Sequence, residues 1–169
     1  AFGFVAEDGL APGVVSVGGY QSRESYRVNN GFVPEQEDNL HWGALSHGPS
    51  GNGALKPDLL APSGQMGTEV GYRKGAGQKG LYRLPPGYSV DGGTSTATPM
   101  AAGAAALVVS AAKQTGVPHD AARLKAALTG SARFIPTLAA HEQGNGLIQV
   151  GPAYALLQKY AATAPLSIA

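Results

Sequence analysis

The chain has 169 residues, with 12 Lys and Arg against 11 Asp and Glu, and a formal net charge of +1 at pH 7. This length fits one domain with a real hydrophobic core, and the near-zero charge argues against electrostatic binding of nucleic acid or an anionic membrane. Charged residues make up only 14% of the chain, which is too few for a solvated, disordered tail.

The chain contains no Cys, which excludes disulfides, thiolate zinc sites and Cys nucleophiles together. No uninterrupted run approaches the roughly 18 apolar residues of a membrane span. Residues 1–6 (AFGFVA) lack the basic leader and the long apolar run of a signal peptide. Because position 1 is not Met, we expect the chain to have been cut from a longer precursor.

The first half of the chain predicts short strands between long, turn-rich segments. Residues 14–18 (VVSVG) form a β-branched run that predicts a buried strand. Residues 21–56 are polar and irregular, with a short strand expected near 42–45. Residues 56–62 (KPDLLAP) predict a strand that enters a loop, and residues 63–91 predict a loop.

A long run of small apolar residues follows at 95–114. A helix that is apolar on nearly every side is expected to be buried, and its small side chains allow close packing. Gly116 is expected to end this helix, and Pro118 prevents it from resuming.

Further elements alternate in type after this helix. The sequence predicts a helix at about 120–131, a short strand at 147–150 (LIQV), and a final helix at about 152–161 that begins with Pro. Strands that alternate with helices predict an α/β layer architecture.

The most informative segment is 91–103 (DGGTSTATPMAAG), where a glycine-rich turn delivers a serine to a helix N-terminus. Gly92 and Gly93 allow the backbone to approach a ligand closely. Ser95 would lie near unpaired helix N–H groups, which favour developing negative charge. Such a hydroxyl can act as an acyl-transfer nucleophile, with its own N–H binding the oxyanion. The alternative is that Thr94 and Ser95 are helix caps, which is the commoner role of these residue types.

Residues 93–99 and 102–103 resemble the nucleophile signature of the subtilases, the subtilisin-like serine peptidases. Three other segments resemble parts of that family in the right order. Residues 14–19 resemble the core strand after the oxyanion asparagine, and 56–64 resemble the strand and turn upstream of the serine. Residues 144–150, with the helix that follows, resemble the C-terminal end of the catalytic domain.

The resemblance extends from about Pro12 to about Leu157 and implies a fold and a chemistry. The expected fold is α/β: residues 1–169 would be the C-terminal portion of a subtilisin-like three-layer domain, with a mainly parallel sheet and a buried central helix. The expected activity is peptide-bond hydrolysis through an acyl-enzyme by a Ser-His-Asp triad. Ser95 would be the nucleophile and a backbone oxyanion donor, and Thr94 would lie beside the oxyanion.

The family order is Asp, His, oxyanion Asn and then Ser, and the first three precede the strand matched at 14–19. Only 13 residues precede Val14, and they contain no Asn and no His. We therefore expect the chain to be inactive alone, and active only with an upstream polypeptide that supplies the Asp, His and Asn. Two smaller departures are Thr96, where Met is usual, and Met100, where a non-catalytic His is usual.

The remaining titratable candidates favour structural roles. The four histidines, His41, His47, His119 and His141, are interpreted as surface, capping or structural residues and not as the catalytic base. Asp91 is close to Ser95 in sequence, but a turn role is favoured for it.

Two weaker motifs leave other binding functions open. Residues 75–80 (GAGQKG) match the G-x-G-x-x-G pattern, but the prolines at 85–86 oppose the helix that a nucleotide site needs. Glu35, Glu37 and Asp38 lack calcium-loop spacing but could contact a cation at the surface. The resemblance implies no required cofactor and leaves structural calcium open.

The sequence thus predicts a serine peptidase chain that acts on peptide or protein substrates in complex with the N-terminal part of the same catalytic domain. We expect no nucleic-acid or membrane partner, and the family implies secretion. The alternative is a non-catalytic scaffold or interaction fragment derived from a subtilase. Because half a domain exposes sheet edges and its core helix, we expect the isolated chain not to be a well-behaved monomer.

Overall fold

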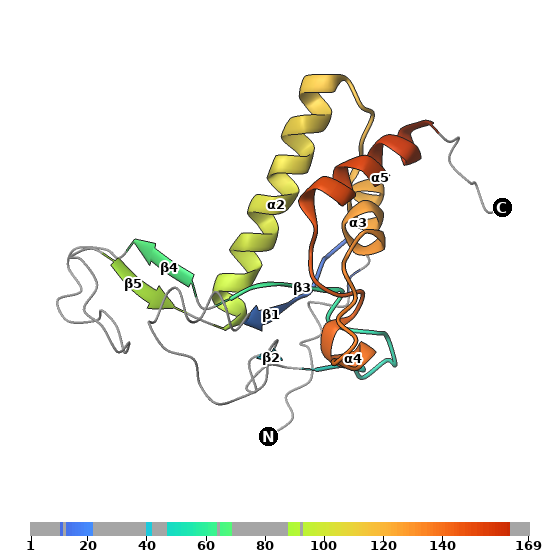
Figure 1. The fold of residues 1–169 in the computed structure, drawn as a ribbon. Coiled ribbons are helices and arrows are strands. Elements are labelled where there is room, and N and C mark those ends of the chain that lie inside the picture. The colour runs from blue at the N-terminus through green and yellow to red at the C-terminus, as the bar shows by residue number, and fades with distance from the viewer. Residues whose placement is uncertain are drawn as a thin grey trace.

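The computed structural model describes residues 11, 13–21, 40–41, 47–63, 65–68, 88–91 and 93–162. These residues form short strands followed by helices (Figure 1), and the α/β character lies in two parallel strands with helices packed against them. The elements are β1 (Val17–Gln21), β2 (Leu40–His41), β3 (Leu59–Pro62), β4 (Gln65–Thr68), β5 (Tyr88–Asp91), α2 (Thr94–Thr115), α3 (Ala121–Gly130), α4 (Ala140–Gln143) and α5 (Val150–Ala162).

The central sheet has the strand order β2-β1-β3. β1 and β3 are parallel, with Val17 opposite Leu59 and Gly19 opposite Ala61. β2 is antiparallel to β1 and meets it only at Tyr20 and Gln21. The parallel pair confirms a strand near the start of the chain, although β1 begins and ends three residues later than the expected run 14–18, and it confirms the expected strand that ends near Pro62.

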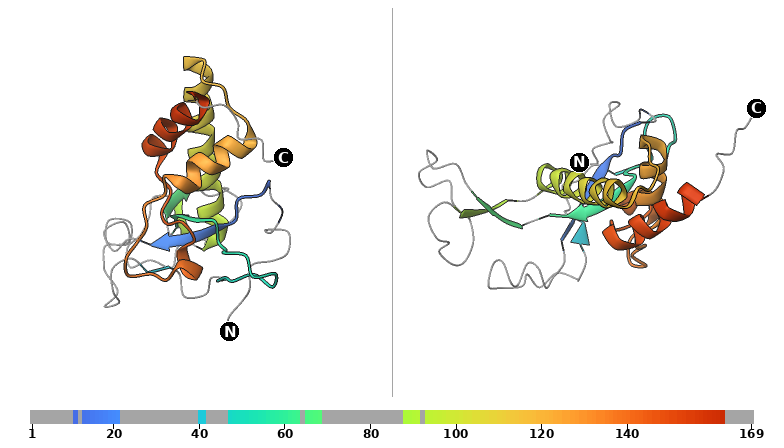
Figure 2. Two further views of the ribbon diagram at one scale, coloured as in Figure 1. Left: turned by 90° about the vertical axis from the view of Figure 1, so that its right-hand side faces the viewer. Right: turned by 90° about the horizontal axis from the view of Figure 1, so that it is seen from above.

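Alternation along β3 places the core on both faces of the parallel pair. Leu59 and Ala61 belong to the main cluster with α2, α3 and α5, in which Val108, Leu128 and Leu157 are buried. Leu60 points to the opposite face and packs in a second cluster with Tyr20, Ile135 and Leu147. Helices α2, α3 and α5 therefore lie on one side of the strands and the segment with α4 on the other (Figures 1 and 2).

The three long helices match the sequence prediction to within about two residues at most ends. α2 ends at Gly116, whose φ of 70° is the left-handed C-cap that glycine adopts at no steric penalty. α3 begins after Asp120, whose carboxylate accepts a hydrogen bond from the backbone N–H of Arg123 at 2.8 Å.

The strand expected at 147–150 is wrong. Leu147 forms only isolated bridges, parallel to Leu60 and antiparallel to Arg133. Val150 is already the first residue of α5, and the N–H of Ala153 donates to the carbonyl of Gln149 at 3.0 Å. Helix α5 therefore begins within the apolar run 147–150, so this run does not form a strand beside β3.

Two elements were not expected from the sequence. β4 and β5 pair antiparallel, with Gln65 opposite Asp91, in a segment interpreted as loop. α4 is a single short helix. The strand expected near 42–45 lies outside the described residues.

α2 is less buried than its composition predicted. One stripe is buried, formed by Ala97, Ala101, Ala104, Val108 and Ala112. A neighbouring face is open, and Met100 and Leu107 on it are 46% and 62% exposed. A helix side with this composition and no cover in the described structure is an unpartnered apolar face.

Length and composition also make α2 the one helix among the described residues that could cross a membrane. The count of uninterrupted apolar residues missed this, because Ser, Thr and Pro interrupt the run without making the segment polar. In its most apolar 18-residue window, 22% is buried within the fold. The core helix of a soluble protein passes the same test.

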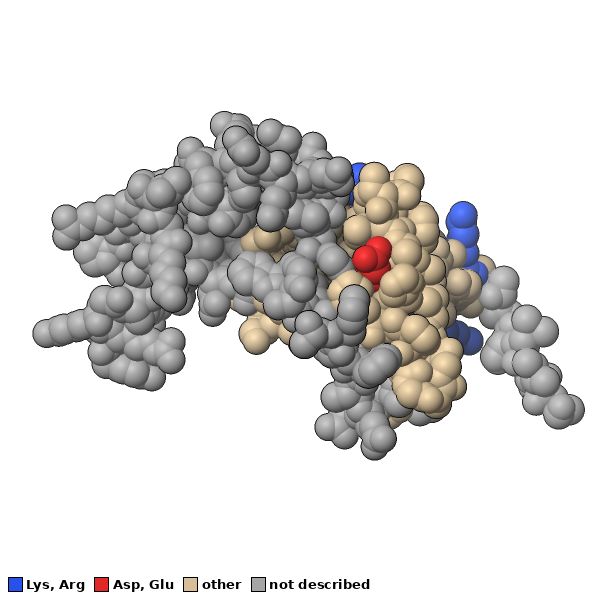
Figure 3. All heavy atoms as spheres, turned by 90° about the horizontal axis from the view of Figure 1, so that it is seen from below, with Lys and Arg blue, Asp and Glu red and all other residues tan. Residues whose placement is uncertain are grey.

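Charged side chains are sparse on the described surface. On the face seen from below, the described area is mostly uncharged, with acidic atoms at one place within it and Lys and Arg side chains at its margin (Figure 3). This distribution agrees with a charged fraction of only 14%.

Candidate functional site

The candidate site is the turn that leads into α2. Gly93 is the N-cap, with φ 82° and ψ −175°, and Thr94 and Ser95 are the first two helical residues. The positive φ explains the glycine, because an L side chain rarely adopts this conformation. A Cβ at position 93 would meet nothing within 4 Å, so the requirement is conformational and not steric.

A hydroxyl network fixes this turn to the carboxyl end of β3. The buried Ser63 hydroxyl donates to the carbonyl of Gly93 at 3.0 Å and lies 3.3 Å from the hydroxyl of Thr96. Thr96 Oγ1 also donates to the Gly93 carbonyl at 3.0 Å. The N–H of Ser63 donates to the carbonyl of Tyr20 at 2.8 Å, which ties the same point to the end of β1.

Sequence reasoning missed the role of Ser63. The available signal was its position, since it directly follows the strand ending at Pro62, and ligands bind at the carboxyl ends of parallel strands. Thr96, noted only as a departure from the family pattern, is a second anchor of the turn. Its hydroxyl donates back to the carbonyl of the N-cap residue Gly93, and no side chain caps the helix N-terminus.

Ser95 is presented to solvent. Its side chain and that of Thr94 are exposed, and within the described part of the chain its hydroxyl makes no hydrogen bond. The first free N–H groups of the helix lie in the same turn, because Thr96 and Ala97 donate to Gly93 but the N–H groups of Thr94 and Ser95 have no described acceptor. The arrangement can supply a hydroxyl and an adjacent backbone donor for developing negative charge.

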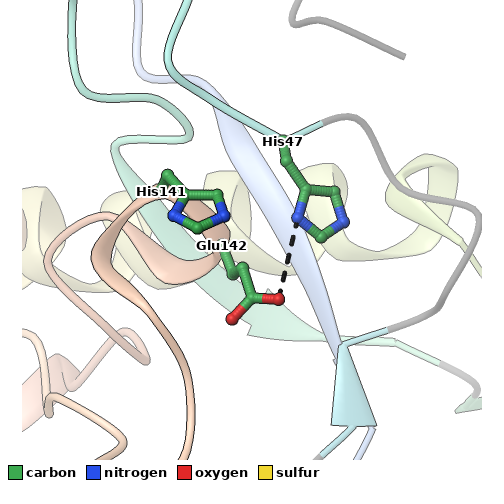
Figure 4. Close-up of side chains that lie close together, drawn as sticks. All are labelled: His47, His141 and Glu142. Atoms are coloured by element: carbon green, nitrogen blue, oxygen red, sulfur yellow. Dashed lines mark ion pairs between the residues drawn. The ribbon is translucent and has the colours of Figure 1, made fainter. Parts of the chain in front are cut away.

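The described histidines lie elsewhere. His119 follows the far end of α2, and its Nδ1 is 3.0 Å from the carbonyl of Val117. The 22 residues of α2 span roughly 33 Å, so His119 is far from Ser95. His47 and His141 lie beside each other at α4, together with Glu142 (Figure 4). None of these three imidazoles hydrogen-bonds Ser95.

Several sequence candidates fall outside what the structure describes. They are the side chains of His41 and Asp91, the acidic residues Glu35, Glu37 and Asp38, Gly92, and the segment 75–80. The backbone of Asp91 ends β5, opposite Gln65.

An apolar hollow lies one turn beyond Ser95. Its volume is about 190 Å³, and its walls include Val15 and Val17 from the β1 side, Thr98, Ala101 and Ala105 from α2, and Leu128 from α3. A cavity of about 150 Å³ accepts a benzene-sized group. The hollow is therefore large enough for one or two apolar side chains.

Comparison with known proteins places this geometry in context. The family model described as "Subtilase family" matches residues 4–146. The human protein "Membrane-bound transcription factor site-1 protease" is 36% identical over 119 residues, which is 70% of this chain and 10% of that protein. "Tripeptidyl-peptidase 2" of Caenorhabditis elegans is 28% identical over 155 residues, 91% of this chain and 10% of that protein. The chain thus spans about a tenth of the length of the curated relatives it matches.

Solved structures share the fold at low sequence identity. Fervidolysin from Fervidobacterium pennivorans, described as a keratinolytic enzyme related to subtilisin, superposes with a TM-score of 0.58 and 18% identity, over 85% of this chain and 19% of that one. The prenylagaramide maturation protease PagA gives a TM-score of 0.54 and 22% identity, over 85% of this chain and 42% of that one. At this identity the likeness establishes the fold alone, and it confirms an α/β fold that corresponds to part of a subtilisin-like structure.

Proposed function

Because the chain belongs to the subtilase family, we propose that it supplies the nucleophile Ser95 to a serine peptidase whose other catalytic groups come from an upstream polypeptide. The observation that carries this proposal is the exposed Ser95 hydroxyl on the first turn of α2, in a turn held by Ser63. A helix cap would need its side chain to accept a backbone N–H, and the Ser95 hydroxyl accepts none among the described residues. The Ser95 hydroxyl is therefore available for chemistry.

The proposed reaction is acyl transfer. Ser95 Oγ attacks the scissile carbonyl carbon while a histidine of the upstream polypeptide takes the hydroxyl proton. The N–H of Ser95 and the amide of an upstream Asn hold the oxyanion, with Thr94 beside it. The C–N bond then breaks, the leaving amine takes the proton from the histidine, and water hydrolyses the acyl-enzyme. No step needs a cofactor.

Two surfaces support a covering polypeptide as partner. The face of α2 that carries Met100 and Leu107 is open. The apolar hollow lies along another side of the same helix, at Thr98, Ala101 and Ala105. On the sheet, β2 pairs with β1 only at Tyr20 and Gln21, so Val17–Gly19 have no described partner strand on that side. A strand that adds to this edge would bury backbone groups, and its side chains would face the hollow and α2. For the same reason, we propose protein and not lipid as the cover of α2.

A fluorophosphonate probe tests the nucleophile assignment. The full chain is labelled alone and after co-expression with the upstream polypeptide of its parent, and the modified residue is located by peptide mass spectrometry. We expect labelling at Ser95 in the complex only, and its loss to background in Ser95→Ala. Ser110→Ala is the matched control, because Ser110 is also exposed on α2.

Two outcomes would contradict the proposal. Labelling of Ser95 in the isolated chain would show that the upstream polypeptide is not needed. A complex that forms but is never labelled at Ser95 would remove the nucleophile role.

That second outcome would favour the alternative function, a scaffold or interaction fragment derived from a subtilase. The open face of α2 is the observation that favours it, since this face needs a partner whether or not chemistry follows. Hydrolysis of a mixed peptide library by the complex separates the two functions, because a scaffold would leave every peptide intact.

The same proposal includes secretion and a cofactor-free reaction, both on the strength of the family resemblance. Secretion is checked by recovering the parent protein from the medium of its source cells and not from the cell pellet. Labelling of Ser95 in the complex that persists in excess EDTA would support the cofactor-free reaction. Loss of labelling in EDTA while the complex stays folded would contradict it.

A further inference from the structure

A second cluster of functional groups lies at α4, away from Ser95. His47, His141 and Glu142 each offer one ligand atom, and these three atoms lie within 4.8 Å of one another. His47 Nδ1 is 4.0 Å from Glu142 Oε1, and the two imidazole ring centroids are 6.2 Å apart. Figure 4 shows the two rings and the carboxylate facing a common space, with His47 contributed by a different segment from the other two.

The backbone holds these segments together. The N–H of Gly48 donates to the carbonyl of His141 at 2.9 Å, directly beside two of the three side chains. Gly48 is buried, and a Cβ there would collide with the carbonyl oxygen of Lys56. The loop that carries His47 is therefore packed too closely to shift relative to α4 without breaking other contacts.

The side chain of Gln143 anchors α4 to the segment that precedes it. The fully buried Gln143 side chain accepts from the N–H of Ile135 at 2.7 Å and donates to the carbonyls of Ile135 and Leu138 at 2.8 and 2.6 Å. These bonds fix the residue next to Glu142. Side chains on a rigid support are the arrangement that preorganises a binding site.

Glu142 is oriented with one oxygen held and one directed at the cluster. Its Oε2 accepts a hydrogen bond from the N–H of Ala139 at 2.7 Å, and Oε1 is the oxygen near His47. In metal centres, the ligating carboxylate is commonly held by such an outer hydrogen bond.

The distances fit a small cation after a modest closure. Metal–ligand bonds of about 2.0–2.2 Å in a tetrahedral site put ligand atoms roughly 3.4 Å apart. The atoms therefore need to approach by up to about 1.4 Å, a shift that small side-chain rotations can supply. The His47 and Glu142 side chains are 16% and 26% exposed, and His141 is exposed, so the cluster is open to an incoming ion.

We propose that His47, His141 and Glu142 form a binding site for a divalent transition metal, with zinc the ion that the donor set fits best. Two imidazole nitrogens and one carboxylate are a zinc donor set, with a water as fourth ligand, whereas calcium and magnesium prefer oxygen donors throughout. The ion joins the turn at residues 47–49 to α4 and thereby stabilises the fold. This inference does not depend on the proposed peptidase chemistry.

The test uses the full chain after metal removal with a chelator. Titration with Zn²⁺ by calorimetry is expected to show one ion per chain, and Co²⁺ is expected to give the visible absorption of a tetrahedral site. Zinc is expected to raise the thermal unfolding midpoint, because it binds the folded state. Binding is expected to weaken as pH falls, because protons compete for the imidazole nitrogens.

Substitutions separate a metal site from a simple ion pair. We expect His47→Gln, His141→Gln and Glu142→Gln each to weaken zinc binding about tenfold or more. Glu142→Gln still offers an oxygen to the N–H of Ala139, so its unfolding midpoint in EDTA should match that of the unmodified chain. His119→Gln is the matched control, and its zinc affinity should not change.

The inference would be overturned if the unmodified chain bound no zinc. Equal zinc affinity in the three ligand variants and the unmodified chain would overturn it too, since the ion would then be held elsewhere.

Discussion

Ser63 shows how a single hydroxyl positions the candidate site. Its side chain is 2% exposed and bonds the carbonyl of Gly93 at 3.0 Å. Gly93 in turn accepts the N–H groups of Thr96 and Ala97 at 3.2 and 3.3 Å, so one carbonyl oxygen joins β3 to the first turn of α2. Ser95 inherits its position from this oxygen, although Ser63 is not itself expected to touch the substrate.

We predict that Ser63→Ala destabilises the fold by about 1 kcal/mol, the usual net contribution of a hydrogen bond. It should also slow fluorophosphonate labelling of Ser95 in the complex. Denaturant unfolding and labelling rates measure the two effects. Ser110→Ala is the control, because its exposed hydroxyl accepts only from Gln114 on the same helix. Unchanged labelling by Ser63→Ala would show that this hydroxyl does not position the nucleophile.

Asp58 is a second residue whose single side chain joins several segments. Its Oδ2 accepts from the N–H of Ser16 and from Lys56 Nζ, each at 2.7 Å, and its Oδ1 lies 3.7 Å from Lys125 Nζ. The side chains of Lys56 and Asp58 are only 6% and 13% exposed. The carboxylate therefore compensates a nearly buried ammonium group and joins β1, β3 and α3.

We predict that Asp58→Asn lowers the free energy of unfolding by about 3 kcal/mol, because it leaves the buried ammonium of Lys56 without a counter-charge. Asp120→Asn removes a carboxylate of the same kind from an exposed helix cap. Because Asn caps as well as Asp, this control should change stability by less than about 0.5 kcal/mol. Comparable unfolding midpoints for the two variants would contradict the prediction.

At the scale of elements, the helices could be predicted from sequence and the sheet only in part. Gly116 and Asp120 are local signals for the end of α2 and the start of α3, and local chemistry decided both. Leu147 was interpreted as part of a strand. In the structure it forms only isolated bridges to Leu60 and Arg133, which are distant in sequence. The β4–β5 hairpin also depends on long-range pairing, and its short strands carry no clear alternation. The same holds for the site: the motif indicated Ser95, but only the folded structure identified Ser63.

The exposed face of α2 provides a prediction at this scale. Gly103 lies in the helix, and a Cβ there would meet nothing within 4 Å. We predict that Gly103→Ala stabilises the isolated chain by about 0.8 kcal/mol, since Ala is the better helix former. In the complex, the added methyl group would occupy space that the partner is proposed to fill, so binding should weaken. Binding assays and unfolding curves on the same variant separate the two effects.

A variant that stabilised the chain and bound the upstream polypeptide equally well would place the interface elsewhere. Gly151→Ala is the control, because a Cβ at this position in α5 also meets nothing within 4 Å. It should leave partner binding unchanged.

For the whole molecule, the described structure is a core that is uncovered at more than one place. The buried stripe of α2 and the two clusters on β3 make a real interior. The open face with Met100 and Leu107 and the edge of β1 lie outside that interior. The apolar hollow borders the interior, because Leu59 and Leu128 line it. The composition of α2 did not reveal this asymmetry, because an alanine-rich helix has the same sequence pattern whether one or both of its sides are packed.

We predict that the isolated chain self-associates with increasing concentration, through this open apolar face. Light scattering coupled to size-exclusion chromatography should show a mass that rises with loading. Leu107→Gln should reduce the association, because Leu107 is 62% exposed and makes the face less polar. Lys113→Gln, on the same helix but at an exposed charged position, is the control. A compact monomer at every concentration would count against an uncovered interface.

The link from Tyr20 through Ser63 to Gly93 has a mechanical consequence. The three groups are joined in series by short hydrogen bonds, so the tips of both parallel strands and the helix start behave as one stiff joint. Bending of the sheet at that end therefore also moves the Ser95 side-chain oxygen. Motion of the β1 backbone therefore changes the position of the Ser95 hydroxyl. A contact that reduces the motion of β1 also reduces the motion of this hydroxyl.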